Sequence, residues 1–447
     1  MLPIIEVPES IRQGMDPYRS VFLRQEGFEH VSRYVTGLII SPNKTLQGIY
    51  DLQVWEPSGR PTRRAMHTGV FEAGWDDDQL MRLHRIKVAK EQRNGGRQVI
   101  SLDWTFAHHE RGPEIFANTR TWDYVENRMA QLQTVVTAVI SNRQRIDGLE
   151  VVVQEPSRRQ EELNYLNHTA REAYEEMEEA QTRILELLYH FLHNKQYRKR
   201  TEIAVDLVRT IEEEGRFPRA HYAFDNGVLT LELTRLIESC KKQWVSELEG
   251  SRLIQWKGEW KSVQGIASEL RSQHLEAFRP VMVRLRNGEK KLRYAFTKVV
   301  RLKKYGRKRL VIAHEEETLQ DEPRFLLTDA LHWESKRVIE TWSYRWGSEI
   351  FHEFGKQVTG LESSQVRKEE AVKRHFRLSC VAQSLLQGVT AVASKSERFE
   401  FAKGQITFGQ RVRTVAREVF GCLLKRAKQL FDQGESWTHV LEALMPA

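Results

Sequence analysis

Three β-rich runs at the start of the main domain constrain the fold of this chain more than any other feature. The first run, 98–106, carries Asp103 near its end. The next two, 133–141 and 149–154, are joined through Asp147-Gly148, a dipeptide that strongly favours a β-hairpin turn. We therefore expect three sequential antiparallel strands, to which later strands and helices are added.

The chain then alternates between helical and extended patterns. Residues 157–214 predict a polar, charged helix, and residues 220–225 predict a strand that ends in Asp225. A helix over 229–242 and a strand over 244–254 follow. Strands that alternate with helices indicate an α/β fold, in which functional residues gather at the carboxyl ends of the strands.

A different pattern begins at residue 255. Three runs with turn signals between them predict a β-meander at 280–286, 292–302 and 310–314. We therefore expect an all-β insertion over 255–323, after which a strand at 324–328 returns to the core. Helical spacing near both ends of the chain predicts helices at 25–40, 364–393 and 408–433.

The composition is that of an ordinary soluble protein with a slight excess of positive charge. The 447 residues are 40% hydrophobic and 29% charged, with a net charge of +8, which favours a nucleic-acid partner. No apolar run approaches the roughly 20 residues of a membrane span, and the N-terminus lacks the pattern of a secretory signal. Three widely spaced cysteines favour a reduced compartment and roles as small core residues: Cys240, Cys380 and Cys422.

Residues 342–356 place one carboxylate between two cations. On one continuous helix, Trp342, Arg345, Glu349 and Lys356 fall within roughly 60° of one another. A separate apolar face is predicted for Trp346, Ile350, Phe351 and Phe354. Such a stripe is suited to bind a phosphodiester and a metal ion side by side. The alternative is a surface helix whose charged residues pair with one another.

Three carboxylates, those of Asp103, Asp225 and Glu349, therefore belong to one mixed α/β unit. Carboxylates that converge need a cation to offset their repulsion, and hard oxygen ligands suit Mg²⁺ or Mn²⁺. Two such ions could activate an attacking water or 3′-hydroxyl on one side of a phosphodiester and stabilise the leaving oxygen on the other. Spacing alone leaves other carboxylates open for these roles, namely Asp123, Asp147, Asp206, Asp329, Glu334 and Glu353.

The motif around Glu349 is similar to the Tyr-x2-Arg-x3-Glu-x6-Lys motif of bacterial insertion-sequence DDE transposases, the branch that cuts and pastes through a DNA hairpin. Arg345, Glu349 and Lys356 match in type and spacing, and Trp342 stands at the Tyr position. Asp103 and Asp225 resemble the first and second acids of that family. The resemblance covers roughly residues 95–360, while both ends of the chain match only in general layout.

This resemblance implies an RNase H-like catalytic core with the β insertion between the second and third acids. Its domains would be 1–94, helical and a candidate for DNA binding; 95–254 and 324–360, the two parts of the core; 255–323, the insertion; and 361–447, helical and a candidate for assembly. It also implies two Mg²⁺ ions, with Mn²⁺ as an alternative, held by the three acids. The partners would be double-stranded transposon ends and target DNA, bound by a homodimer in the bacterial cytoplasm at the nucleoid.

Three positions depart from the family pattern without removing a metal ligand. Trp104 follows the first acid where many relatives carry another Asp, Asn226 replaces a common Ser after the second acid, and Trp342 replaces Tyr. We expect that each of these departures could weaken catalytic activity.

Candidate DNA contacts lie in and beyond the motif. By resemblance, Arg345, Lys356 and Trp342 would contact the terminal phosphates. The basic turn 301–309 is suited to clamp a DNA backbone, or is a solvated hairpin tip, and its candidates are Lys303, Lys304, Arg307, Lys308 and Arg309. Trp256 or Trp260 would stack on a flipped base or, alternatively, pack in the core.

Two adjacent histidines, His108 and His109, lie close to Asp103 and suggest a metal site. Adjacent residues of an extended chain face opposite ways, so these residues are interpreted as loop histidines instead.

The leading hypothesis is a DNA transposase that cleaves at transposon ends through a hairpin and transfers the freed strand into target DNA. One alternative is a transposase-derived DNA-binding protein that has lost catalysis. Another is a structure-selective nuclease on the same RNase H-like fold, which would cut hairpins without joining ends to a target.

Overall fold

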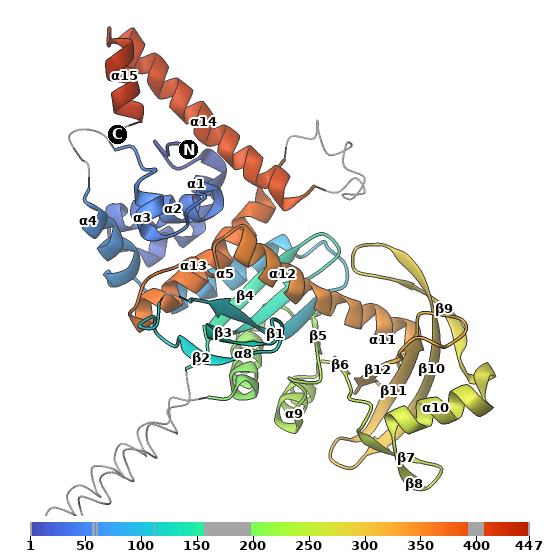
Figure 1. Cartoon of the computed structure of the whole chain (residues 1–447). Helices are drawn as coiled ribbons and strands as arrows, with labels where there is room; N and C mark the ends of the chain where they lie inside the picture. The colour runs from blue at the N-terminus through green and yellow to red at the C-terminus, as the bar shows by residue number, and fades with distance from the viewer. Residues whose placement is uncertain are drawn as a thin grey trace, which may run out of the picture.

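A single mixed sheet forms the centre of the structure (Figure 1). The computed structural model describes residues 2–445 except 56–58, 60, 111, 156–197 and 392–405. Twelve strands run in the order β2-β3-β1-β5-β6-β12-β11-β10-β7-β8, with β4 paired to β3 and β9 paired to β10. The strands are β1 Val99–His108, β2 Thr119–Asp123, β3 Arg128–Ser141, β4 Ile146–Val153, β5 His221–Phe224, β6 Trp244–Glu247, β7 Leu253–Trp256, β8 Glu259–Ser262, β9 Arg279–Arg284, β10 Lys290–Leu302, β11 Gly306–His314 and β12 Arg324–Thr328.

Helices surround this sheet and make up both ends of the chain. The N-terminal helices are α1 Glu9–Met15, α2 Gln25–Ile40, α3 Leu46–Tyr50, α4 Arg63–His67 and α5 Asp77–Glu91. The others are α8 Arg200–Glu214, α9 Leu231–Ser239, α10 Val263–Gln273, α11 Ser335–Trp342, α12 Trp346–Gln357, α13 Glu369–Gly388, α14 Phe408–Asp432 and α15 Trp437–Leu444. The mixed α/β class is therefore as the sequence predicts. Among the described residues, no helix combines the length and apolar character needed to cross a membrane.

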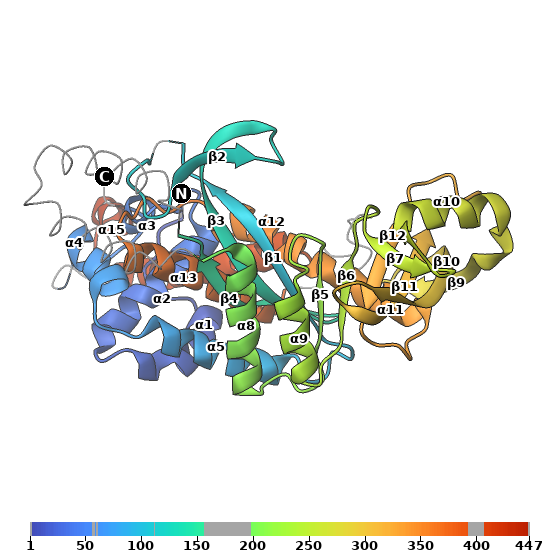
Figure 2. The same cartoon turned by 90° about the horizontal axis from the view of Figure 1, so that it is seen from below.

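One half of the sheet combines antiparallel and parallel pairing. β1 is antiparallel to β3 and parallel to β5, and β5 is parallel to β6. β4 extends this half as the antiparallel neighbour of β3. In Figure 1, α8 and α9 lie on one side of these strands, and α12 and α13 lie on the other. Figure 2 shows α8 and α9 across the near face.

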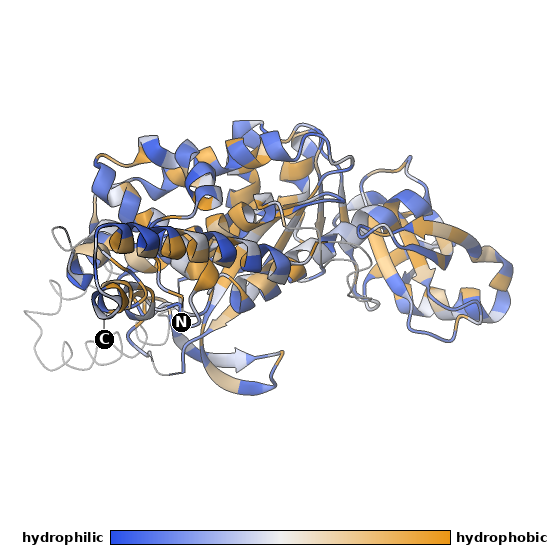
Figure 3. Ribbon diagram, turned by 90° about the horizontal axis from the view of Figure 1, so that it is seen from above, coloured by the Kyte–Doolittle hydropathy of each residue, from blue (hydrophilic) through white to orange (hydrophobic). Residues whose placement is uncertain are grey.

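Alternation along β1 decides which of its side chains reach each face. Ile100 and Leu102 are fully buried in the cluster that includes α8 and α9. Because successive side chains of a strand point to opposite faces, Asp103 points toward α12 instead. Apolar residues line the strands and the inner sides of the helices (Figure 3), which is the pattern expected of a sheet covered on both faces.

The N-terminal helices pack on the C-terminal region rather than standing apart. α2 spans the predicted range, and its buried Tyr34 hydroxyl is 2.9 Å from Nδ1 of His375 on α13. Both residues belong to helices that share one hydrophobic cluster, so the two ends of the chain form a common layer above the sheet.

The predicted turn at Asp147-Gly148 is wrong. The turn lies at residues 142–145, where the Asn142 amide donates to the Arg145 carbonyl, and Asp147 and Gly148 belong to β4 beside a β-bulge. Asp147 is fully buried and paired with Arg145. Asp147-Gly148 therefore lies beside a bulge and does not form a turn. Glycine is needed at position 148 because a Cβ there would collide with α12 and α13.

Three other local predictions need correction. The insertion is not all-β, because α10 lies within it, and its meander β9-β10-β11 continues the central sheet through β12. The predicted strand 244–254 is split into β6 and the start of β7, and β2 was not predicted. The helix predicted at 157–214 is seen from Arg200 as α8, and its earlier part, 157–197, lies outside the described residues.

The motif region is not one continuous helix. α11 ends at Trp342, a 3₁₀ turn spans Ser343–Arg345, and α12 begins at Trp346. Trp342, Arg345 and Glu349 nevertheless stay together across this turn, because Arg345 contacts both the Trp342 ring and Glu349. The predicted apolar face is incomplete, since Phe351 is buried but Trp346 is 58% exposed.

Candidate active site

The first two predicted acids lie side by side because of strand register. Leu102 of β1 pairs with Phe224 of the parallel strand β5, and one residue further along each strand direction come Asp103 and Asp225. Neighbouring strands are about 4.8 Å apart. The two carboxylates therefore project from adjacent positions at one end of this pair.

The third acid approaches from α12. The Ser348 hydroxyl donates to Oδ2 of Asp103 at 2.8 Å, and Nη1 of Arg345 lies 3.3 Å from the same oxygen. The other guanidinium nitrogen of Arg345 pairs with Glu349. Arg345 thus joins the first and third acids, and the structure brings together three carboxylates and one motif cation.

A hydrogen bond to the sheet fixes the position of α12. Nε2 of His352 is 2.8 Å from Oγ1 of Thr137 on β3, and Thr137 is the cross-strand partner of Asp103. Burial, with help from the cations Lys356 and Arg345, lowers the pKa of His352 to about 3. The imidazole is therefore neutral near pH 7 and serves as an anchor one turn from Glu349.

Burial raises the pKa of all three acids, and the negative charge of Asp103 adds to the rise for Asp225 and Glu349. For Asp103, burial is the chief cause, opposed by Arg345 and Ser348. For Asp225, burial comes first and the negative charge of Asp103 second. For Glu349, burial comes first, Arg345 opposes it, and Asp103 adds to the rise. Asp103 therefore interacts electrostatically with each of the other two acids, and Arg345 offsets only part of the effect of burial.

The donor set fits the divalent ions that the resemblance implies. Three carboxylates supply the hard oxygen ligands that these ions prefer, and a bound cation would offset the repulsion of Asp225 and Glu349 by Asp103. The backbone amides of Gly227 and Val228 donate to Oδ1 of Asp225 at 3.1 and 3.2 Å. This contact orients that carboxylate.

The remaining motif residues lie on either side of the acids. The guanidinium groups of Arg324 and Arg345 lie over the Trp342 ring, 4.4 and 5.3 Å from its centroid. Nε of Arg345 and Nε1 of Trp342 are buried without an acceptor. Nζ of Lys356 is 2.5 Å from Oε1 of Glu362. Trp342 and Arg345 thus carry unused donors, whereas Lys356 is paired within the chain.

The basic turn divides into exposed and internal residues. Lys303, Lys304 and Arg307 are exposed at the β10-β11 turn. Lys308 is buried, 3.1 Å from Glu238, and Nε of Arg309 donates to the Leu331 carbonyl at 2.8 Å. Both side chains are therefore engaged within the chain, which differs from their prediction as DNA contacts: Lys308 is buried against Glu238, and Arg309, on the opposite face of β11, binds the Leu331 carbonyl.

The other candidates are mostly occupied by local contacts. Trp256 is 4% exposed and packs in the core, whereas Trp260 is 45% exposed on β8. Asp206 pairs with Arg198 and Arg209, and Oδ1 of Asp329 accepts from the Trp244 amide. Glu334 and Glu353 are exposed. Of the three cysteines, only Cys380 is a buried core residue.

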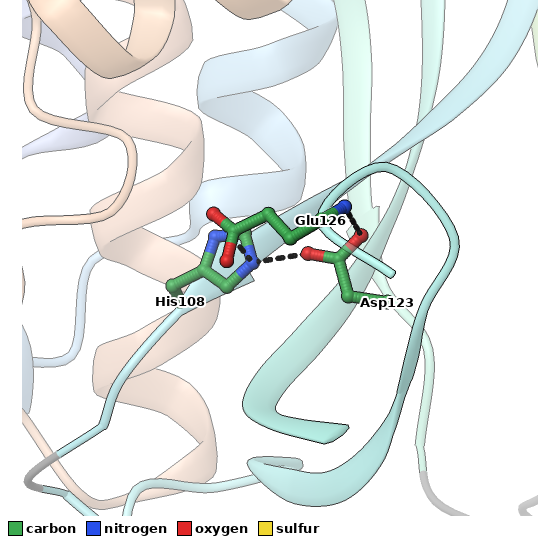
Figure 4. A group of neighbouring side chains, drawn as sticks. All are labelled: His108, Asp123 and Glu126. Carbon is green, nitrogen blue, oxygen red and sulfur yellow. Dashed lines mark hydrogen bonds and ion pairs between the residues drawn. The ribbon is translucent and has the colours of Figure 1, made fainter. Parts of the chain in front are cut away.

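A second group of possible metal ligands was not predicted as such. Figure 4 shows the carboxylates of Asp123 and Glu126 directed toward the imidazole of His108. Their nearest ligand atoms all lie within 4.8 Å of one another, an arrangement that could hold a metal ion. His108 belongs to β1 rather than to a loop, so its interpretation as a loop histidine is wrong. His109 does face the opposite way, with Nε2 2.9 Å from Oε1 of Gln133.

The spacing of His108, Asp123 and Glu126 in the sequence does not indicate that they form a group. His108 and Asp123 are brought together when β2 pairs with β3 and β3 pairs with β1. The pKa of Asp123 is below its usual value: burial would raise it, but hydrogen bonds from His108 and from the amides of Val125 and Glu126 outweigh that effect. The carboxyl is therefore ionised near neutral pH.

Comparison with known proteins assigns no family. No protein-family model matches the chain, and no curated protein is significantly similar to it.

Proposed function

We propose that this protein is a DDE-type DNA transposase, which cleaves DNA at transposon ends through a hairpin and joins the freed strand to target DNA. The observation that carries the proposal is the convergence of Asp103, Asp225 and Glu349 around Arg345. These residues come from two strands and a helix that are far apart in the sequence. A surface helix with internal ion pairs gives no reason for this convergence.

The sheet order supports an RNase H-like core. Three antiparallel strands, β4-β3-β1, are followed by two strands parallel to β1, namely β5 and β6. The three acids lie on this half of the sheet and on the helix that covers it. The segment between Asp225 and Glu349 carries β7 to β11, in the place where the resemblance expects an insertion.

Each motif residue has a distinct role in this proposal. Asp103, Asp225 and Glu349 would hold two Mg²⁺ or Mn²⁺ ions, which supply an activated oxygen nucleophile and stabilise the leaving oxygen. Arg345, with one donor lacking an acceptor, would bind a DNA phosphate by a charge-assisted hydrogen bond. Lys356 would exchange Glu362 for a phosphate, and Trp342 would support Arg345 through its ring.

The decisive experiment uses DNA from both sides of the coding region, searched first for short inverted repeats. The full-length protein is incubated with this DNA, a target plasmid and Mg²⁺ or Mn²⁺. We expect nicked ends, hairpin products and joined products from the wild type. Asp225→Asn should bind the same DNA and cut none of it, while Asp206→Asn, a surface aspartate, should cut normally.

Two other outcomes would replace the proposal. A wild-type protein that binds the ends but never nicks them with either ion would be a transposase-derived DNA-binding protein. A protein that cuts hairpins but never joins an end to the target would be a nuclease of the same architecture.

A further inference from the structure

The group formed by His108, Asp123 and Glu126 is separate from the three-carboxylate site. His108 lies five residues beyond Asp103 near the end of β1, Asp123 ends β2, and Glu126 lies in the turn before β3. Nε2 of His108 is 2.7 Å from Oδ2 of Asp123 and 4.0 Å from Oε1 of Glu126. One nitrogen and two oxygens thus face one another from three positions.

Each of the two carboxylates is held by a hydrogen bond to its other oxygen. Oδ1 of Asp123 accepts from the amides of Val125 and Glu126 at 2.7 and 3.2 Å, which leaves Oδ2 toward His108. Nε of Arg128 donates to Oε2 of Glu126 at 2.5 Å, which leaves Oε1 toward His108. Protein metal ligands are commonly oriented by such outer contacts. These outer contacts orient Oδ2 of Asp123 and Oε1 of Glu126 toward Nε2 of His108.

The second nitrogen of the histidine also faces a carboxylate. Nδ1 of His108 lies 3.8 Å from Oε1 of Glu362. A histidine that binds a metal through one ring nitrogen usually donates the other N–H to a carboxylate or carbonyl, which fixes the tautomer. Glu362 is the carboxylate on this side of the ring, at a distance longer than a hydrogen bond.

We propose that His108, Asp123 and Glu126 bind one divalent transition-metal ion of the Zn²⁺ type through Nε2, Oδ2 and Oε1. An imidazole with two carboxylates is a mixed nitrogen and oxygen donor set, which suits Zn²⁺ better than Mg²⁺. The two carboxylates neutralise the charge of the ion. The site is accessible, because the side chain of Glu126 is 44% exposed and that of His108 is 20% exposed.

Binding of the ion to Nε2 of His108 requires the proton on this nitrogen to move to the other ring nitrogen. In the present structure the 2.7 Å contact with Asp123 is a hydrogen bond of Nε2. When the ion binds Nε2, the ring proton is carried by Nδ1, which lies 3.8 Å from Oε1 of Glu362. One Nε2–H bond is replaced by one Nδ1–H bond as the coordinate bonds form, so the ring neither gains nor loses a proton.

This site is linked to the candidate active site by one shared carboxylate. Glu362 lies near both Nδ1 of His108 and Nζ of Lys356, and these two contacts use the same oxygen, Oε1. An ion bound to His108 places the ring proton on Nδ1 and so increases the attraction between Nδ1–H and Glu362. The ion pair between Glu362 and Lys356 is weakened as a result. The metal site itself does not depend on the proposed transposase function.

The test uses the full chain with Asp225→Asn and Glu349→Gln, so that the three-carboxylate site does not compete for the ion. After treatment with a chelator, Zn²⁺ is titrated against a chromogenic chelator of known affinity. We expect one equivalent to bind, with Mg²⁺ unable to displace it at equal concentration. Adding His108→Ala should weaken binding about ten-fold or more, and Glu126→Gln should do the same while keeping the contact between His108 and Asp123.

A matched control is His274→Ala. His274 is an exposed histidine whose Nδ1 lies 3.3 Å from one carboxylate, that of Glu276, and its loss should leave Zn²⁺ binding unchanged. Circular dichroism confirms that each variant is folded. The proposal is overturned if the folded parent protein binds no Zn²⁺, or if neither His108→Ala nor Glu126→Gln weakens binding; the group is then an ion-pair cluster only. Zn²⁺ binding is measured independently of DNA cleavage, so the proposed metal site and the proposed transposase function can be refuted separately.

Discussion

His352 of α12 and Thr137 of β3 meet in a buried hydrogen bond, with Nε2 and Oγ1 2.8 Å apart. Thr137 lies directly across the strand pair from Asp103. This bond therefore ties the helix that carries Glu349 to the strand position opposite the first acid.

Replacing Thr137 with Val should loosen this attachment. The variant leaves the buried imidazole of His352 without its partner, and we expect it to lower the free energy of unfolding by about 1–3 kcal/mol. Cleavage should fall as well, because Glu349 is positioned by the same helix. Denaturant unfolding and the cleavage assay measure these effects. Thr134→Val, at a partly exposed position of the same strand, is the control; an equal loss in both variants would contradict the positioning role.

Asp225→Asn should make the protein more stable while it abolishes cleavage. The pKa of Asp225 is raised in the folded state by burial and by Asp103, so its ionisation near pH 7 opposes folding. Removing the charge should raise the melting temperature by about 1–3 °C. Asp206→Asn is the comparison, since Asp206 pairs with two surface arginines. A lower melting temperature for Asp225→Asn would show that its charge stabilises the fold.

The exposed part of the basic turn should contribute to DNA affinity through phosphate contacts. Replacing Lys303, Lys304 and Arg307 together with Ala should reduce the slope of log affinity against log salt by up to about 2.7, since each phosphate contact contributes about 0.9. Fluorescence anisotropy over a salt series measures this slope. Lys308→Ala should instead lower stability, because Lys308 is buried against Glu238. An unchanged slope in the triple variant would remove this turn from the DNA-binding surface.

Gly148 should not tolerate a side chain. A Cβ at this position would lie 2.5 Å from Sγ of Cys380 and 2.7 Å from the ring of Phe351. We expect Gly148→Ala to cost about 1–3 kcal/mol in the free energy of unfolding, because overpacking forces neighbours to shift. Gly421→Ala, in α14 with nothing within 4 Å of the added atom, should stabilise by about 0.5–1 kcal/mol. Equal effects would mean that β4, α12 and α13 adjust freely.

Asp329 should make stability depend on pH. Burial raises its pKa to about 6, against an opposing hydrogen bond from the Trp244 amide. The stabilising effect of the neutral carboxyl is complete below the unfolded-state pKa of about 4, and it is lost as the pH rises through 6. We therefore expect Asp329→Asn, which stays neutral, to gain about 2 kcal/mol relative to the wild type between pH 4 and pH 7.

Unfolding free energies across this pH range test the prediction, with Asp51→Asn, at an exposed position, as the control. A constant difference between Asp329→Asn and the wild type would show that Asp329 is ionised throughout.

Local sequence patterns were sufficient for several elements. The helical spacing of apolar residues predicted α2 with its observed bounds, and the runs separated by Gly-containing turns predicted β9, β10 and β11. Asp225 was correctly placed at the end of a strand, whereas Asp103 lies in the middle of β1 and not near its end. Such predictions succeed because the period of a helix or strand is set by neighbouring residues within a few positions.

Only the tertiary structure decided which distant residues meet. The register of β1 with β5 places Asp103 beside Asp225, and the pairing of β2, β3 and β1 brings His108 to Asp123. The chain also tightens into a 3₁₀ turn at Ser343–Arg345, which the local apolar period does not indicate. Strand register and helix packing are set by burial summed over the whole core, so residues many positions apart become neighbours for reasons that their own sequence segments do not contain.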